Sequence, residues 1–95
     1  MLLNINVNEL KGLTYRVNII DIRDNYIYNL GNIPSSKNVP YNFLILNPED
    51  YLNKDQTYYI YCGMGINSIK ACSVLSNKGY KVINVLGGYN EYISH

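Results

Sequence analysis

The chain has 95 residues, a length that suits one compact domain with a single hydrophobic core. Its hydrophobic fraction of 47% and charged fraction of 16% are typical of a globular protein and argue against a disordered one. Eight basic and seven acidic residues, spread along the sequence, leave a net charge of +1 and no charge pattern for nucleic acid or an anionic membrane as a partner. We therefore expect residues 1–95 to form a single domain.

No apolar run approaches the roughly 20 residues that span a bilayer, and the N-terminus lacks the pattern of a secretory signal. The two cysteines, Cys62 and Cys72, are not spaced as a CxxC pair, and the one histidine is the last residue, His95. These features argue against a disulfide framework and against a metal site. We expect a cytoplasmic protein with no metal and no cofactor.

In the first half of the chain, short apolar segments alternate with turn residues. The predicted elements, in chain order, are an apolar run at Leu2 to Ile5, a capped helical turn at Asn6 to Lys11, a buried strand at Val17 to Ile22, a short helix at Arg23 to Leu30 and a proline-bounded loop with one extended piece at Ile33 to Pro40. Residues 41–52 are ambiguous, with a helical face that Pro48 would end.

The second half gives clearer patterns. The predicted elements are a strand at Thr57 to Tyr61, a loop at Cys62 to Ile66, a helix at Asn67 to Lys78, a strand at Lys81 to Val85, a turn at Gly87 and Gly88, and a helical turn at Tyr89 to Ile93. Strands that alternate with helices of this length predict an α/β fold with a parallel sheet and right-handed crossovers.

Cys62 stands where a predicted strand ends and a predicted helix begins, and sites in such sheets form at these junctions. If the loop curls with its amides inward, those amides and the start of the helix would stabilise a thiolate, because cysteine pKa values fall at helix N-termini. Glycine at 63 and 65 permits the positive φ or the close backbone approach that a tight loop needs. The same pattern also describes a buried, unreactive cysteine, so the residues alone leave both interpretations open.

Two separated stretches resemble the signatures of the single-domain rhodanese-type sulfurtransferases. The family's order of strand, cysteine loop, helix, glycine, strand and Leu-Gly-Gly turn is followed in the second half of the chain by IYCGMGINSIKACSVLSNKGYKVINVLGGYNEY. The family's other signature resembles the stretch NIIDIRDNYIYNLGNIPSSKNVP in the first half. The residues that match this signature position by position are Asp21, Arg23, Tyr28, Gly31, Ile33, Pro34, Asn38 and Pro40. The likeness covers about residues 19–92 and implies a rhodanese-like α/β fold, with a central parallel β-sheet and helices on both faces.

The resemblance also implies a mechanism in which Cys62 is the catalytic residue. Its thiolate would take a sulfane sulfur from a small donor, hold it as a persulfide and pass it to a thiol or cyanide acceptor. The loop that would bind the anion consists of Gly63, Met64, Gly65, Ile66, Asn67 and Ser68. Asp21 and Arg23 would support the site by ordering neighbouring loops, and a purely structural use of this pair is the favoured interpretation.

The loop departs from the family pattern because it carries no charge. Family loops often have a basic residue where this chain has Gly63 and an arginine where it has Asn67. A dianionic donor such as thiosulfate would therefore be held by amides alone, without charge-assisted hydrogen bonds. We expect weak thiosulfate activity, with polysulfide, a small persulfide or a persulfide-carrying partner protein as better donors. The Gly-x-Gly start also resembles mercaptopyruvate-using relatives, which are usually larger.

The remaining candidates narrow the function further. A cysteine-dependent phosphatase needs Cys-x5-Arg, and this chain has Ser68 at that arginine position, which argues against a phosphatase. Cys72 shares a helix face with Ala71 and Leu75, so core packing is its expected role, while Met64 would face the pocket mouth or a partner. Two functional classes stay open: a small sulfurtransferase, and a non-catalytic rhodanese-like module that binds a partner or senses redox state.

Overall fold

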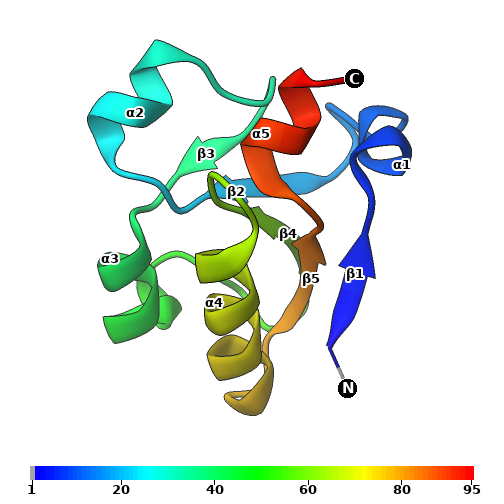
Figure 1. Ribbon diagram of the computed structural model, residues 1–95. Helices are drawn as coiled ribbons and strands as arrows, with labels where there is room; N and C mark the ends of the chain where they lie inside the picture. The colour runs from blue at the N-terminus through cyan, green and yellow to red at the C-terminus, as the bar shows by residue number, and fades with distance from the viewer. Residues whose placement is uncertain (1) are drawn as a thin grey trace.

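A computed structural model describes residues 2–95 and contains a five-stranded sheet in the order β1-β5-β4-β2-β3, with every neighbouring pair parallel (Figure 1). The strands are β1 (Leu3–Ile5), β2 (Asn18–Asp21), β3 (Lys37–Asn38), β4 (Thr57–Tyr61) and β5 (Lys81–Val85). The helices are α1 (Val7–Lys11), α2 (Asn25–Leu30), α3 (Tyr41–Leu46), the 3-10 helix η1 (Pro48–Asp50), α4 (Ile66–Asn77) and α5 (Gly88–Ile93).

The central strand β4 has β5 on one side and β2 on the other, so it is the most enclosed strand of the sheet. The side chains of β4 alternate between the two faces, as the period of two in a strand requires. Tyr58 and Ile60 join the core on one face, and Tyr61 joins the core on the other. Cys62 follows directly at the carboxyl end of β4, which places it at the edge of the sheet where parallel folds form their sites.

Helices cover both faces of the sheet and close two hydrophobic cores. On one face, α3 contributes Leu44 and α4 contributes Ala71, Cys72 and Leu75. On the other face, α1 contributes Val7 and Leu10, and the α5 tyrosines pack against them. Figure 1 shows α3 and α4 next to each other in the lower part of the view. The predicted α/β fold, with a central parallel sheet and helices on both faces, is confirmed.

The predicted elements agree closely with the observed ones. The strands at Thr57–Tyr61 and Lys81–Val85 have the predicted bounds, and α4 begins and ends one residue earlier than predicted. The ambiguous segment resolves into α3 and η1, and Pro48 starts the 3-10 turn because its missing N–H costs nothing at that position. None of the helices in residues 2–95 has the length and apolar character needed to span a bilayer.

Candidate active site

The sulfur of Cys62 is surrounded by hydrogen-bond donors from the loop and from α4. Its Sγ accepts hydrogen bonds from the backbone N–H of Gly65 at 3.1 Å and of Ser68 at 3.3 Å. The thiol donates in turn to Oγ of Ser68 at 3.4 Å, and Ser68 is fully buried. In the thiolate form this hydroxyl can reverse its role and donate to sulfur. The site thus offers three groups that stabilise negative charge on Sγ.

These contacts follow from the way α4 begins. The first amides of any helix lack intrahelical partners and need an acceptor. The residue before α4 is Gly65, which has no side chain and adopts φ +91°, so no side chain of its own caps the helix. The sulfur of Cys62 takes the place of the capping oxygen by accepting from Ser68, in the first turn. Anionic sulfur at this position is stabilised by both the amides and the positive end of the helix dipole.

The cysteine loop is fixed from its other side by the start of α5. The N–H of Tyr89 donates to the carbonyl of Cys62 at 2.8 Å, and the N–H of Asn90 donates to the carbonyl of Gly63 at 2.9 Å. Gly88 lies so close to the loop that an added Cβ would stand 2.4 Å from the oxygen of Cys62. In Figure 1 the yellow-green loop between β4 and α4 lies beside the start of α5. Sequence reasoning missed this clamp, although the paired glycines marked a turn there.

The two loop glycines have different roles. Gly65 needs to be glycine because of its positive φ and because a Cβ would approach the backbone nitrogen of Gly87 to 3.0 Å. The same expectation for Gly63 is wrong: its φ is not positive, and a Cβ built there has no neighbour within 4 Å. Position 63 is therefore open to other side chains without a backbone penalty.

A shallow pocket of about 300 Å³ opens above the cysteine. It is lined by Cys62, Gly63, Met64, Ile66 and Asn67, none of which carries a charge. Met64 is 68% exposed and Ile66 60% exposed, so the rim is apolar and open to solvent. Met64 thus faces the pocket mouth as predicted. Gly65 and Ser68 do not line the pocket but lie buried beside the sulfur.

Asp21 and Arg23 are brought together, but neither lines the pocket. Asp21 is fully buried at the end of β2 and accepts from the backbone N–H of Arg23 at 2.8 Å and from its guanidinium at 2.6–3.1 Å. The guanidinium also donates to the carbonyl of Gly31 at 2.7 Å. Burial alone would lower the pKa of Arg23, but the hydrogen bonds and charge of Asp21 shift it upward. The pair orders the chain after β2, which agrees with the structural interpretation.

Cys72 lies in the core on the inner face of α4 and has no exposed surface. Burial, and then the charge of Cys62, raises the pKa of this thiol to about 12. A thiol that stays protonated and enclosed is not a nucleophile at neutral pH. Cys72 is therefore a packing residue, as its place on the helix face predicted.

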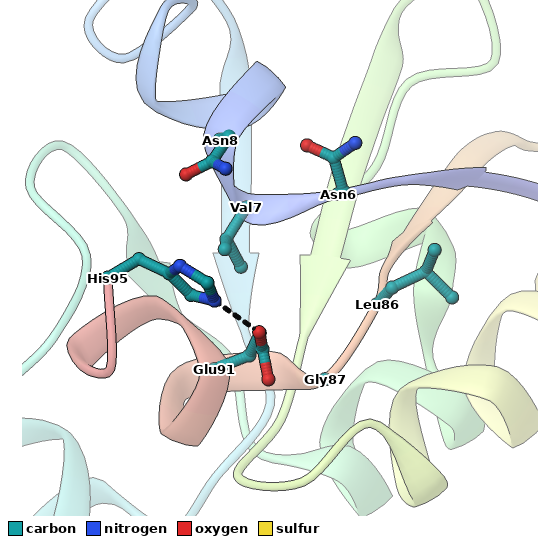
Figure 2. A pocket seen from close by; sticks show the side chains of 7 residues that line it. All are labelled: Asn6, Val7, Asn8, Leu86, Gly87, Glu91 and His95. Carbon is teal, nitrogen blue, oxygen red and sulfur yellow. Dashed lines mark hydrogen bonds and ion pairs between the residues drawn. The ribbon is translucent and has the colours of Figure 1, made fainter.

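A second pocket, of about 360 Å³, lies on the other side of Gly87 from the cysteine loop (Figure 2). Its lining residues are Asn6, Val7, Asn8, Leu86, Gly87, Glu91 and His95. Within it, Nε2 of His95 contacts a carboxylate oxygen of Glu91, one turn earlier in the chain. Both side chains are more than two-fifths exposed, so the pair adds little stability. The pocket holds no cysteine and is distinct from the predicted site.

Comparison with protein families identifies the class to which this fold and cysteine loop belong. The sequence model of the rhodanese-like domain family matches residues 6–95. The chain belongs to this family, and the resemblance expected from its two motifs is confirmed.

Individual relatives support the assignment. The chain is 31% identical over 83 residues to a sulfurtransferase of Allochromatium vinosum, covering 86% of this chain and 77% of that protein. It is 44% identical over 61 residues to a tRNA sulfurtransferase of Thermoplasma acidophilum, covering 64% of this chain and only 12% of that protein. A crystal structure of a Staphylococcus saprophyticus protein superposes with a TM-score of 0.88 at 34% identity, over 96% of this chain and 93% of the other.

Proposed function

We propose that the protein is a sulfurtransferase in which Cys62 carries the sulfur as a persulfide. The observation that carries this proposal is the set of donors around Sγ: the amides of Gly65 and Ser68 at 3.1 and 3.3 Å, with the Ser68 hydroxyl at 3.4 Å. A buried structural cysteine needs no such donors, whereas a nucleophilic thiolate does. The names of the family relatives as sulfurtransferases support the same chemistry.

In the first half-reaction the Cys62 thiolate attacks the outer sulfur of a donor such as polysulfide or an organic persulfide. A bond forms between Sγ and that sulfur, the S–S bond of the donor breaks, and the donor fragment leaves with the electron pair. The negative charge of the attacking thiolate leaves with the donor fragment, while the outer sulfur of the new persulfide keeps the charge that it carried in the ionised donor. The loop amides beside Sγ, those of Gly65 and Ser68, are already in place to stabilise negative charge on sulfur without reorganising during the reaction.

In the second half-reaction an acceptor nucleophile, cyanide or a thiolate, attacks the outer sulfur. The bond between that sulfur and Sγ breaks, and Cys62 regains its thiolate beside Gly65 and Ser68. One sulfur atom passes from donor to acceptor, and no external oxidant or reductant is consumed. The cysteine is an intermediate carrier, which is covalent catalysis in two steps.

The pocket favours donors with little negative charge. Apart from the Cys62 thiolate its lining residues are uncharged, and the exposed rim consists of Met64 and Ile66. Thiosulfate carries two negative charges and would lose solvation on entry without gaining a charge-assisted hydrogen bond, which is roughly twice as strong as a neutral one. A small persulfide or the persulfide of a partner protein carries less charge and would enter at a lower cost, and polysulfide spreads its charge along a chain of polarisable sulfur atoms that an apolar rim tolerates better. We expect weak turnover with thiosulfate.

The test is steady-state sulfur transfer to cyanide, measured as thiocyanate, with polysulfide and thiosulfate as donors. We expect turnover by the wild-type protein and by Cys72→Ala, and none by Cys62→Ser. Polysulfide should have the higher kcat/KM; a higher value for thiosulfate would contradict the argument from the neutral pocket. If Cys62 accepts sulfur but no acceptor removes it, the chain is a non-catalytic binding or sensing module instead.

A further inference from the structure

We propose that Arg23 is a positioning residue for the cysteine loop and that it acts through the ring of Tyr89. This inference rests on the proposed reactivity of Cys62 and assigns to the Asp21–Arg23 pair a role beyond the local ordering described above. The path runs from the buried carboxylate of Asp21, through the guanidinium and the tyrosine ring, to the backbone amides at the start of α5.

The guanidinium of Arg23 is held in one orientation. Asp21 accepts hydrogen bonds from Nε and from one terminal nitrogen, at 2.6–3.1 Å, and that terminal nitrogen also donates to the carbonyl of Gly31 at 2.7 Å. Its central carbon then lies 4.3 Å from the centre of the Tyr89 ring and 5.6 Å from that of Tyr61. A planar cation at this distance from an aromatic face is attracted to it, and partial burial strengthens the attraction.

The ring of Tyr89 is confined from several sides. Its centre lies 6.4 Å from the ring centre of Tyr61 and 6.1 Å from that of Tyr92. Its hydroxyl oxygen lies 2.6 Å from the position of a Cβ added at Gly31, so a side chain there would displace the ring. Arg23 therefore contacts both the ring and, through the Gly31 carbonyl, the segment against which the hydroxyl end packs.

The same residue, Tyr89, holds the cysteine loop through its backbone. Its N–H donates to the carbonyl of Cys62, and the next N–H, of Asn90, donates to the carbonyl of Gly63. Residues 2–95 contain no cis peptide bond, so each N–H points opposite to the carbonyl of its own peptide plane. With the two carbonyls directed at α5, the amides of Gly63 and Met64 point away from α5.

Arg23 thus fixes the direction of loop amides that it never touches. α5 is only six residues long, too short to hold its own orientation, and it begins at Gly88 directly after Gly87, both of which have positive φ. The ring of Tyr89 supplies the packing that the helix lacks. Loss of the cation–ring contact would allow the first turn of α5 to move and would misalign the amides around the reacting sulfur.

The experiment measures the rate at which iodoacetamide alkylates Cys62, with the modified residue identified by peptide mass spectrometry, together with kcat and KM for polysulfide. The variants are Arg23→Lys, which keeps the charge beside Asp21 but loses the planar stack, Tyr89→Leu, which removes the ring, and the double variant. Tyr89→Phe is the conservative rescue. The matched control is Lys11→Ala. The ammonium of Lys11, on α1, lies 4.9 Å from the ring centre of Tyr92, which belongs to α5 like Tyr89 but makes no backbone hydrogen bond to the cysteine loop.

We expect Arg23→Lys and Tyr89→Leu each to lower the alkylation rate and kcat about tenfold, with KM unchanged. The double variant should be no slower than either single variant, because the effects of substituting two residues in contact do not add. Tyr89→Phe and Lys11→Ala should stay within twofold of wild type. Rates within twofold for Arg23→Lys, or a double variant equal to the product of the single effects, would overturn the proposal. If wild type accepts no sulfur although alkylation follows the expected pattern, only the sulfurtransferase proposal fails.

Discussion

Substitution of Gly88 by alanine tests whether the contact between α5 and the cysteine loop is as tight as the structure requires. Gly88 has φ +61°, and a non-glycine residue in this region costs about 1–2 kcal/mol. The added Cβ would lie 2.4 Å from the carbonyl oxygen of Cys62 and 2.8 Å from that of Gly63, both backbone atoms that cannot rotate away. The loop or the helix must therefore move.

Such a movement disrupts two hydrogen bonds, those of the Tyr89 and Asn90 amides, each with a net value of about 0.5–1.5 kcal/mol. Together with the backbone strain, the expected loss is about 2–5 kcal/mol of the free energy of unfolding. Small domains have roughly 5–15 kcal/mol in total, so the variant should unfold at a much lower urea concentration.

Urea unfolding, followed by circular dichroism, measures the loss, and Gly63→Ala is the matched control. Position 63 has open space and no positive φ, so we expect that variant to stay within about 0.5 kcal/mol of wild type. Under conditions where Gly88→Ala remains folded, its Cys62 should also be alkylated more slowly. A Gly88→Ala protein as stable as Gly63→Ala would refute the reasoning from the close contact.

Two further predictions concern charge. Because a side chain fits at position 63, Gly63→Arg should raise kcat/KM for thiosulfate about tenfold through a charge-assisted hydrogen bond. The neutral control Gly63→Gln should leave kcat/KM unchanged. Equal effects of the two substitutions would contradict the role given to charge. Burial, and then the charge of Cys62, raises the pKa of Cys72 from 9.0 to about 12, so the folded state keeps a proton that the unfolded chain loses in this range. The stabilisation by Cys72 is thus complete below pH 9 and declines toward pH 12. Over this range the difference in unfolding free energy between wild type and Cys72→Ala should shrink by up to about 1.4 kcal/mol per pH unit. A difference that stays constant with pH would contradict the assignment of Cys72 as a buried, protonated thiol.

Much of the fold could be predicted from local patterns. The strand β4 consists of β-branched and aromatic residues, β5 is rich in β-branched ones, and the predicted bounds of both agree with the structure to the residue. The α4 face of Ser68, Ala71, Cys72 and Leu75 is buried as its spacing indicated. Residues 41–52 stayed ambiguous because their apolar residues fit either period, and tertiary packing of Leu44 decides for a helix.

The site was predictable where its contacts are local and not where they are distant. The loop amides that reach Cys62 lie within six residues of it, so the strand, glycine and helix pattern indicated them. The clamp by Tyr89 and Asn90 joins segments far apart in the sequence, and no local pattern reports such a contact. Gly63 was misjudged because a glycine in a loop does not reveal its φ, and this one needs no special conformation.

The central claim is that Cys62 holds sulfur covalently, and intact-protein mass spectrometry after brief exposure to polysulfide tests it most directly. Wild type and Cys72→Ala should gain one sulfur atom, lose it on addition of cyanide, and show no gain when Cys62 is replaced by serine. A wild-type protein that stays at its original mass, or a Cys62→Ser protein that gains the sulfur equally well, would contradict the account.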